Sequence, residues 1–254
     1  MLDEQDREIS LTFAKGLSVL LAFDARDRSI TVSEIAQKVG LNRAVARRLV
    51  RTLEQLGYVT SDRGRYALTP HVLRLSQGFI EGRGIPQLIQ PVLRAAADDI
   101  GEAVSFAMLD DTDAVYVAHA FLPAKFTLNR ISVGTRVPLW PTAAGRAILA
   151  FLNAERGDPL LKTPEFAVYA NAAGTDQSAF SELLAVIRAA GYAITDSEYI
   201  VGVGSIAVPV LDPARGEVIG ATSIIFECGR YNEAELAEMA LRLRTCAAHI
   251  AAAF

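Results

Sequence analysis

The sequence predicts an α+β protein with a small N-terminal helical unit that carries a β-hairpin, and a larger C-terminal domain. Three observations indicate this class. Residues 30–69 follow a pattern of helix, glycine, helix and hairpin; a break containing glycine and proline follows at residues 82–86; and most later strands come in hairpins, with helices before and after them. Strands grouped in this way are typical of an antiparallel sheet covered by helices. We expect a flexible leader (1–10), a first domain (11–69), a helical linker (70–85) and a second domain (86–254).

Length and composition limit the class of protein. The chain has 254 residues, of which 51% are hydrophobic and 21% charged, which is ordinary for a globular protein with a sizeable core. No stretch approaches the roughly 18 uninterrupted apolar residues of a membrane span, and the acidic N-terminus is unlike a secretory signal. Cys228 and Cys246 have no metal-ligand spacing, and the three histidines are far apart in the sequence. We therefore expect a cytoplasmic protein with no metal site, no cofactor and no membrane association.

The N-terminal unit begins with a helix that we place at about residues 11–25. Ser33 is expected to cap the next helix and Gly40 to end it, because glycine adopts the left-handed conformation that closes a helix. Asn42 is expected to cap a further helix, and two strands then flank the turn at residues 62–64. The expected buried face of that helix consists of Val45, Leu49, Thr52, Leu53 and Leu56. This order predicts a winged helix-turn-helix, whose second motif helix can enter the major groove of DNA.

Arginines cluster on the polar face of that helix and on the predicted wing. Residues 41–74 contain seven arginines and two acidic residues, a net charge of +5, whereas the whole chain has a net charge of −4. A basic patch on an acidic protein favours contact with phosphates. The alternative is a solvated helix face with no partner. The predicted DNA-contacting residues are Asn42, Arg43, Arg47, Arg48, Arg51, Arg63 and Arg65.

The linker and the second domain follow from the same kind of signals. Thr69 and Pro70 form a helix start, and Leu73, Leu75 and Phe79 make this helix apolar enough to be buried. After the break, we expect helices at residues 85–100, 143–152, 181–190 and from the Asn232 cap to the C-terminus. The expected strands are residues 104–109, 114–120, 126–132, 205–211 and 218–226.

Four segments together resemble one protein family over almost the whole chain from about residue 13. They are FAKGLSVLLAF, SEIAQKVGLNRAVARRLVRTLEQLGYV, GTRVPLWPTAAGRAILAFL and DSEYIVGVGSIAVPVLDPARGEVIGATSI. The arrangement resembles an IclR-type transcriptional regulator, and residues 41–58 are similar to the branch that controls aromatic-acid catabolism, including protocatechuate, 4-hydroxybenzoate and β-ketoadipate regulators. The resemblance implies a GAF-like domain that binds a small carboxylic acid effector, a homodimer or homotetramer, and a palindromic DNA target.

The resemblance also implies where the effector binds. The segment at residues 138–145 matches the part of the family that turns into a helix whose N-terminal amides face the ligand, and a helix N-terminus favours an anion. In this chain, Ser205 falls where relatives often have cysteine, and Ile225 where some have a polar residue. The implied effector-binding residues are Arg136, Trp140, Thr142, Ala143, Ala144, Thr195, Asp196, Ser205, Ser223 and Ile225.

Two of these residues have an alternative interpretation. Arg136 is a candidate to bind a carboxylate with two hydrogen bonds, but a surface salt bridge is an equally good account of it. Trp140 replaces the small or histidine-like residue common there and is able to stack on an aromatic ring, but plain core packing explains it as well.

Other patterns point to two rival functions. Residues 202–207 match the dinucleotide fingerprint G-x-G-x-x-A, but the β-like sequence with Pro209 that follows is not the helix that this motif requires. No nucleophile–base set stands out, so a DNA-tethered enzyme has little support. An architectural DNA binder with an inert oligomerisation domain is the other alternative, and it would bind without sequence preference.

Overall fold

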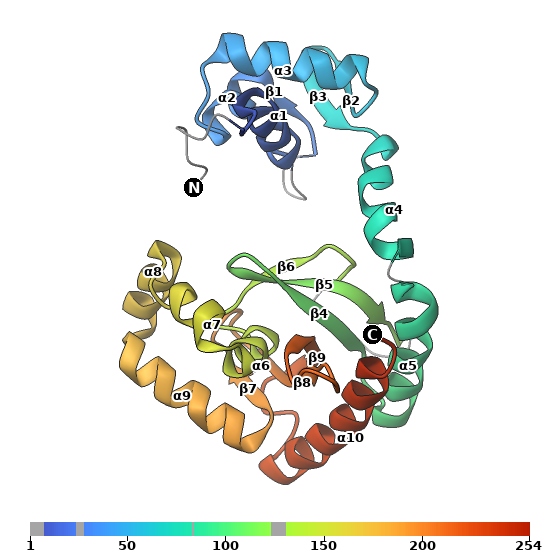
Figure 1. Cartoon of the computed structure of the whole chain (residues 1–254), viewed down its shortest axis with the longest axis vertical. Helices are drawn as coiled ribbons and strands as arrows, with labels where there is room; N and C mark the ends of the chain where they lie inside the picture. The colour runs from blue at the N-terminus through green and yellow to red at the C-terminus, as the bar shows by residue number, and fades with distance from the viewer. Residues whose placement is uncertain (1–7, 24–27, 83, 123–130) are drawn as a thin grey trace. The chain divides into compact units, whose positions relative to one another are not determined.

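The computed structural model describes residues 8–23, 28–82, 84–122 and 131–254 of the chain (Figure 1). Two compact units share these residues, Met1–Gly82 and Arg83–Phe254. The first unit contains helices α1 (Leu11–Leu21), α2 (Val32–Lys38), α3 (Arg43–Gln55) and α4 (Leu73–Gly82), a 3₁₀ turn η1 (Pro70–Val72), and strands β1 (Ile30–Thr31), β2 (Val59–Asp62) and β3 (Arg65–Leu68). The predicted order of helix, helix and hairpin is confirmed, while part of the expected leader and residues 24–25 of the expected first helix lie outside the described residues.

Side-chain caps fix the two helices of the helix-turn-helix. The prediction that Ser33 caps α2 is wrong, because Thr31 does so: its hydroxyl accepts from the Glu34 N–H at 3.3 Å, and the Glu34 carboxylate accepts from the Thr31 N–H at 2.6 Å. This reciprocal capping box satisfies two amides that a helix start otherwise leaves open. Asn42 caps α3 as predicted, accepting from the Val45 N–H at 2.9 Å. Gly40 lies between the helices at φ 66°, a conformation that disfavours side chains other than glycine.

The buried face of α3 is displaced from the predicted one. Ala46, Val50 and Leu53 are its buried residues, whereas Leu56 is 58% exposed. Thr52 also lies outside, with its hydroxyl bonded to a backbone oxygen of its own helix. Because the side chain of Ala46 is small, its contribution to the apolar pattern was too weak for the buried residues of α3 to be predicted correctly. The arginines nevertheless remain on the exposed side.

A tight hairpin and a short third strand make the wing. Arg63 and Gly64 connect β2 to β3 with φ values of 48° and 81°, and two successive positive φ values are the pattern of a type I′ turn. The sequence did not predict β1, which pairs with β3 through Ile30 and Tyr66. This strand has only two residues, too few to show alternation.

The second unit is built on one six-stranded antiparallel sheet with the order β6-β5-β4-β9-β8-β7. Its strands are β4 (Val104–Asp110), β5 (Asp113–Ala120), β6 (Arg136–Pro138), β7 (Ala193–Asp196), β8 (Val203–Leu211) and β9 (Val218–Glu227). The β4–β5 and β8–β9 hairpins are therefore confirmed. The strand expected at residues 126–132 falls largely outside the described residues, and residues 131–132 are not in a strand. The short strands β6 and β7 were not predicted.

Helices cover both faces of this sheet (Figure 1). Helices α5 (Ile85–Ile100) and α10 (Glu233–Ala251) pack on one face, over a core that includes Phe106, Ile224 and Leu243. The other face is covered by α6 (Ala143–Phe151), with α7 (Ala154–Leu160), α8 (Pro164–Ala173) and α9 (Gln177–Ala190) around it. Among the described residues, no helix is long and apolar enough to cross a membrane. The short helices α7 and α8 were not predicted, although Thr163 and Pro164 give α8 the same start as Thr69 and Pro70 give the turn η1.

Candidate functional site

The first candidate site is the exposed face of α3 together with the wing. The side chains of Arg43, Arg47, Arg48 and Arg51 are all exposed along α3, and Arg63 is exposed at the turn of the hairpin. None of these five arginines forms an ion pair within the described part of the chain. They therefore present uncompensated positive charge to solvent. Such a surface suits the phosphates and base edges of DNA.

Two predicted DNA-contacting residues already have partners within the unit. The Asn42 side chain is used in capping α3. Arg65 donates from Nε to the Ser29 hydroxyl at 3.1 Å, donates to the Ser29 carbonyl, and lies 3.8 Å from the Glu34 carboxylate. Arg65 thus connects the wing to the start of α2, a positioning contact that the sequence pattern does not show.

The second candidate site is a small pocket between α6 and the sheet, with a cavity volume of about 30 Å³. Six of the predicted effector-binding residues line it: Thr142, Ala144, Thr195, Ser205, Ser223 and Ile225. They come from α6 and from the three adjacent strands β7, β8 and β9. Antiparallel pairing brings Thr195 opposite Ser205, and Ser205 opposite Ile225. Residues up to 83 positions apart in the sequence therefore meet in one cavity.

The N-terminus of α6 forms one wall of this pocket. Thr142 caps the helix: its hydroxyl accepts from the Gly145 N–H at 3.3 Å and donates to the Pro138 carbonyl at 2.7 Å. The Ala143 and Ala144 N–H groups have no hydrogen-bond partner among the described residues. Unpaired amides and the positive end of the helix dipole favour a negative charge here.

Hydroxyl groups form the sheet side of the pocket. Thr195 and Ser205 share a hydrogen bond of 2.6 Å. The Ser223 hydroxyl is buried and has no partner with hydrogen-bond geometry in the described part of the chain. Burial raises the pKa of Tyr116, and the nearby Ser223 hydroxyl lowers it, although the two hydroxyls do not have the geometry of a hydrogen bond. An unsatisfied buried hydroxyl costs free energy, which a ligand group would recover.

Four predicted residues do not line the pocket. Arg136 is bonded to the carboxylates of Asp110 and Asp113, at 3.0 Å to the latter. Partial burial lowers the pKa of Arg136, but the hydrogen bonds to Asp110 and Asp113 outweigh it, so the pKa is raised. The salt-bridge alternative is thus the one observed, and a role for Arg136 in effector binding stays a prediction. Ala143 is buried just behind the wall.

The remaining two of these residues lie beside the site. Trp140 is buried in the aromatic cluster, 6.3 Å from the Tyr169 ring and nearly parallel to it, and its indole nitrogen has no described partner. Asp196 is exposed and accepts hydrogen bonds from the Cys228 thiol and the Ser197 hydroxyl. The bond from Cys228 and then the bond from Ser197 are the main causes that lower the pKa of Asp196. Trp140 therefore packs in the core, as the alternative interpretation predicted.

Several functional residues escaped the sequence pattern. The pocket is also lined by Tyr116, Val137, Pro141, Tyr199, Ile200 and Val203. Behind it, the buried Arg146 forms an ion pair with Glu198, which follows β7. Neither partner shows its role in the sequence, because 51 residues separate them and only the fold brings them together. An arginine inside the predicted helix 143–152 was the one available signal.

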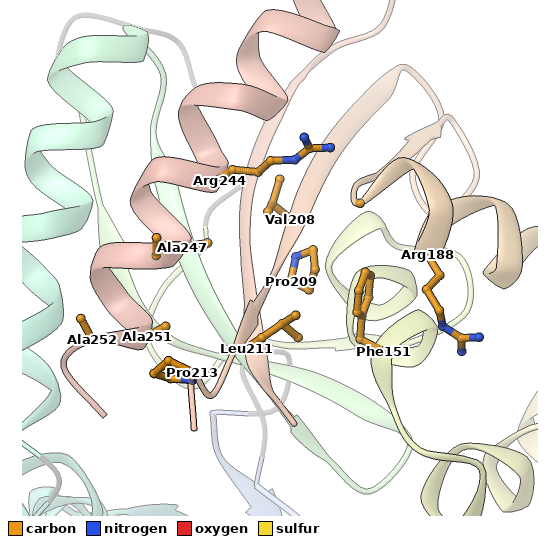
Figure 2. Close-up of a pocket in the computed structure, with 12 residues that line it drawn as sticks. Phe151, Arg188, Val208, Pro209, Leu211, Pro213, Arg244, Ala247, Ala251 and Ala252 are labelled. Carbon is orange, nitrogen blue, oxygen red and sulfur yellow. The ribbon is translucent and has the colours of Figure 1, made fainter. Parts of the chain in front are cut away.

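A larger, open groove lies elsewhere in the second unit, with a cavity volume of about 520 Å³. Figure 2 shows that α10 supplies Arg244, Ala247 and Ala251, that Val208 and Pro209 belong to the strand at the floor, and that the end of the Arg188 side chain points away from them. None of the predicted site residues lines this groove. No group of three or more His, Cys, Asp or Glu side chains suited to a metal ion is present in the described ranges.

Comparison with known proteins gives the same two-part division. The family described as IclR helix-turn-helix domain matches residues 12–63, and the family described as bacterial transcriptional regulator IclR C-terminal matches residues 77–252. The Pca regulon regulatory protein of Pseudomonas putida is 31% identical over 231 residues, covering 91% of this chain and 79% of that protein.

Two further relatives complete the comparison. The p-hydroxybenzoate hydroxylase transcriptional activator of Acinetobacter baylyi is 30% identical over 91% of this chain and 86% of its own length. The crystal structure of an IclR homologue from Microbacterium hydrocarbonoxydans, complexed with 4-hydroxybenzoate, matches with a TM-score of 0.74 and 22% identity over 95% of this chain and 98% of that one. This last similarity supports the fold. With both family matches, the chain belongs to the IclR family of bacterial transcriptional regulators.

Proposed function

We propose that this regulator senses a small aromatic carboxylic acid in the pocket at α6, and that the acid changes its affinity for a promoter of catabolic genes. The observation that carries the proposal is the pocket itself, which has unpaired helix amides at one end and an unpartnered buried hydroxyl at the other. The names of the two curated relatives and the ligand of the Microbacterium homologue support the aromatic class.

The acid group is assigned to the helix end of the pocket. No charged side chain of the described residues lines the pocket, so a carboxylate would be recognised by backbone dipoles, the Ala143 and Ala144 amides. Backbone amides at a helix start are well suited to this because they are fixed before the ligand arrives. Arg136 is not needed in this arrangement, since its guanidinium is already bonded to Asp110 and Asp113.

The far end of the ligand is assigned to the hydroxyls on the sheet. A ring between the apolar side chains of Val137, Ile200 and Ile225 would place a para substituent near Ser223 and Tyr116. A phenolic hydroxyl there would supply the missing partner of the Ser223 hydroxyl. This favours 4-hydroxybenzoate and protocatechuate over short aliphatic acids such as glyoxylate and pyruvate.

A thermal-shift screen tests the effector class, with 4-hydroxybenzoate, protocatechuate, β-ketoadipate, glyoxylate and pyruvate as probes. A ligand at a hundred times its dissociation constant stabilises the fold by about 2.7 kcal/mol. We expect shifts with the aromatic acids that Ser223→Ala weakens and that the control Ser181→Ala, on the outer face of α9, leaves unchanged. A response to glyoxylate or pyruvate alone would overturn the aromatic class, and silence from all five would overturn the proposal.

On the DNA side, we propose that α3 enters the major groove of a palindromic operator. Arg43 and Arg47, near the N-terminus of α3, would reach base edges, while Arg48, Arg51 and Arg63 would contact phosphates. Asn42 and Arg65 would position this surface through their contacts within the unit. Residues 11–69 would then be the DNA-binding domain, 70–85 the linker and 86–254 the effector-binding domain, in a protein of the cytoplasm where the chromosome is.

A palindromic target requires at least a dimer, which is also proposed here. Phe13, Leu17 and Leu21 recur every four residues on α1, and all three are exposed, Leu21 at 82%. Leu73 and Leu75 of α4 are exposed as well, although the sequence predicted that this helix would be buried. Apolar faces of this kind are typical of contacts with a second copy.

The pocket is proposed to bind its ligand without turnover. Its described lining contains serine, threonine and tyrosine hydroxyls but no histidine, cysteine, lysine or carboxylate, so these hydroxyls have no base beside them to activate them as nucleophiles. Incubation of the protein with 4-hydroxybenzoate, followed by chromatography, should return the acid unchanged. A product that accumulates with time would favour the DNA-tethered enzyme instead.

A further inference from the structure

One short segment closes the pocket on its outer side. Residues 197–202 connect β7 to β8, and Tyr199 and Ile200 of this segment line the pocket. The next residue, Val201, is 89% exposed. Tyr199 and Ile200 are themselves 48% and 40% exposed, so their side chains stand between the cavity and solvent.

A buried ion pair holds this segment to α6. Arg146 is only 4% exposed and donates from Nη1 to Glu198 Oε1 at 2.8 Å and from Nη2 to Glu198 Oε2. Its Nε donates to the Trp140 carbonyl at 2.6 Å, and Nη2 also donates to the Tyr169 hydroxyl at 2.9 Å. The hydrogen bonds to Trp140 and Tyr169 fix the arginine independently of Glu198, whereas Glu198 belongs to the segment and is partly exposed. Any relative motion thus moves Glu198 and its neighbours.

The two ends of the segment are residues with positive φ values. Ser197 and Gly202 adopt φ values of 57° and 79°. Ser197 donates its N–H to the Val203 carbonyl at 2.9 Å, and Gly202 donates its N–H to the Ser197 hydroxyl at 3.2 Å. These bonds close the segment on itself and do not attach it to α6. Among the described hydrogen bonds, Glu198 alone joins the segment to that helix.

We propose that Arg146 and Glu198 form a latch that keeps residues 197–202 closed over the pocket, and that the effector enters and leaves when this latch opens. The inference rests on the proposed function of the pocket. Arg146 and Glu198 are positioning residues, since neither lines the cavity and both act through Tyr199 and Ile200. Separating them exposes the entrance at the cost of a bidentate ion pair, which is among the strongest side-chain contacts.

The chain contains a reporter of opening that needs no ligand. Cys228 contacts both Asp196 and Ser197 at the base of the segment, at 2.6 and 3.1 Å. The other thiol, Cys246, is 3% exposed, and burial raises its pKa to about 12. Cys228 is already partly exposed, so an aromatic disulfide reagent should label it in the closed state and faster when the segment opens, whereas Cys246 should react only when the domain unfolds.

The labelling rate of Cys228 is compared in the wild type, in Glu198→Gln and in a control. We expect Cys228 to be labelled on the order of tenfold faster in Glu198→Gln than in the wild type, which corresponds to a loss of about 1.4 kcal/mol in the stability of the closed segment. The matched control is Glu238→Gln, which removes a similar carboxylate from an exposed ion pair with Arg242 on α10; it should label like the wild type. An unchanged rate in Glu198→Gln would overturn the latch.

A second variant covers the possibility that Glu198→Gln unfolds the domain. Glu198→Gln leaves the charge of Arg146 buried without a counterion, which destabilises the domain. Labelling of Cys246 would show that the variant has unfolded. The double variant Arg146→Met with Glu198→Gln removes both charges, and the same comparison is made with it. Faster labelling of Cys228 alone supports the latch, and wild-type labelling in this folded protein overturns it.

Stopped-flow binding of 4-hydroxybenzoate gives the second readout. Opening the latch should raise both the association and the dissociation rate constants of Glu198→Gln, on the order of tenfold each. A purely structural role would raise the dissociation rate constant alone, which would overturn the gating role. If 4-hydroxybenzoate does not bind to the wild type, the proposed effector fails, and the labelling experiment still decides the latch.

Discussion

At the scale of single residues, Gly145 shows how one position determines the shape of the pocket. A Cβ added there would overlap the backbone of Leu139, so only glycine lets α6 start this close to the preceding segment. The same close approach places Thr142 and the open amides at the cavity. The glycine was visible in the sequence, but its reason for being there lies in the contact with Leu139, which only the fold reveals.

Gly145→Ala should therefore destabilise the second unit by about 1–3 kcal/mol, the usual cost of overpacking a core. Gly157→Ala is the matched control, because its Cβ would meet only Leu152 at 3.6 Å, an ordinary contact, in the middle of α7. Alanine there should be neutral or stabilise by about 0.5–1 kcal/mol. Urea denaturation followed by circular dichroism measures both. Equal stabilities would show that α6 shifts without cost.

Alanine substitutions of two arginines on the proposed DNA-binding surface should change DNA binding in different ways. Arg47→Ala should remove a base contact worth about 1–3 kcal/mol of discrimination, so binding to selected operators should fall more than binding to random DNA. Arg63→Ala should weaken both alike and reduce the salt slope by about one. Fluorescence anisotropy at several salt concentrations measures the two ratios. A uniform loss from both variants would contradict the assignment of Arg47 to base edges.

At the scale of elements, the sequence predicted what local signals encode. Asn42, Thr142 and Asn232 each cap the helix that follows them, because a side-chain oxygen before an apolar periodic run is a local signal. Strands β1 and β6 have only two and three residues, too few for alternation to be recognised, and β7 has four but is joined to β8 by the six residues 197–202 and not by a tight turn. The candidate pocket was predicted in part: its α6 and β7–β9 residues came from the family resemblance, whereas Tyr199 and Ile200 depend on how a loop folds back.

A tyrosine at the start of α10 makes the contact between two elements depend on pH. The Tyr231 hydroxyl donates to Glu102, just before β4, and burial together with this bond raises the pKa of Tyr231 to about 12. A raised folded-state pKa means that the bond contributes its full stability below the unfolded pKa of about 10. The contribution is then lost as the pH rises from about 10 through 12.

Tyr231→Phe should thus be less stable than the wild type at pH 8, and the difference should shrink between pH 10 and 12. The phenylalanine ring keeps the edge-on contact with Phe226, so the comparison isolates the hydroxyl. Tyr192→Phe is the control, because the hydroxyl of Tyr192 has no hydrogen bond in the described ranges. Chemical denaturation at each pH provides the values. A difference that is constant up to pH 12 would contradict the role of this bond.

At the scale of the whole molecule, the proposed dimer rests on the exposed apolar side chains of α1. Replacing Phe13 and Leu21 together by serine should shift the protein toward monomers and raise the dimer dissociation constant at least about tenfold, since burying one such side chain contributes about 1.5–3 kcal/mol. The control Val168→Ser alters an equally exposed residue on α8. Analytical ultracentrifugation distinguishes the two. An unchanged dimer, or a monomeric wild type, would contradict the role of α1.

Regulation requires that the pocket and the DNA-binding surface be coupled, and the coupling has a quantitative form. If 4-hydroxybenzoate changes the affinity for operator DNA by some factor, then operator DNA must change the affinity for 4-hydroxybenzoate by the same factor, typically about 5- to 150-fold. If the acid weakens DNA binding, it releases the protein from the promoter, and if it strengthens DNA binding, it recruits the protein there. Calorimetric titration of the acid with and without operator, beside DNA binding with and without the acid, measures both factors.

Ser223→Ala should weaken binding of the acid and leave DNA binding in its absence unchanged, because Ser223 lies in the second unit and the arginines in the first. Equal affinities for the acid with and without operator would show that the pocket and the DNA-binding surface act independently, and the protein would then not be a ligand-controlled switch.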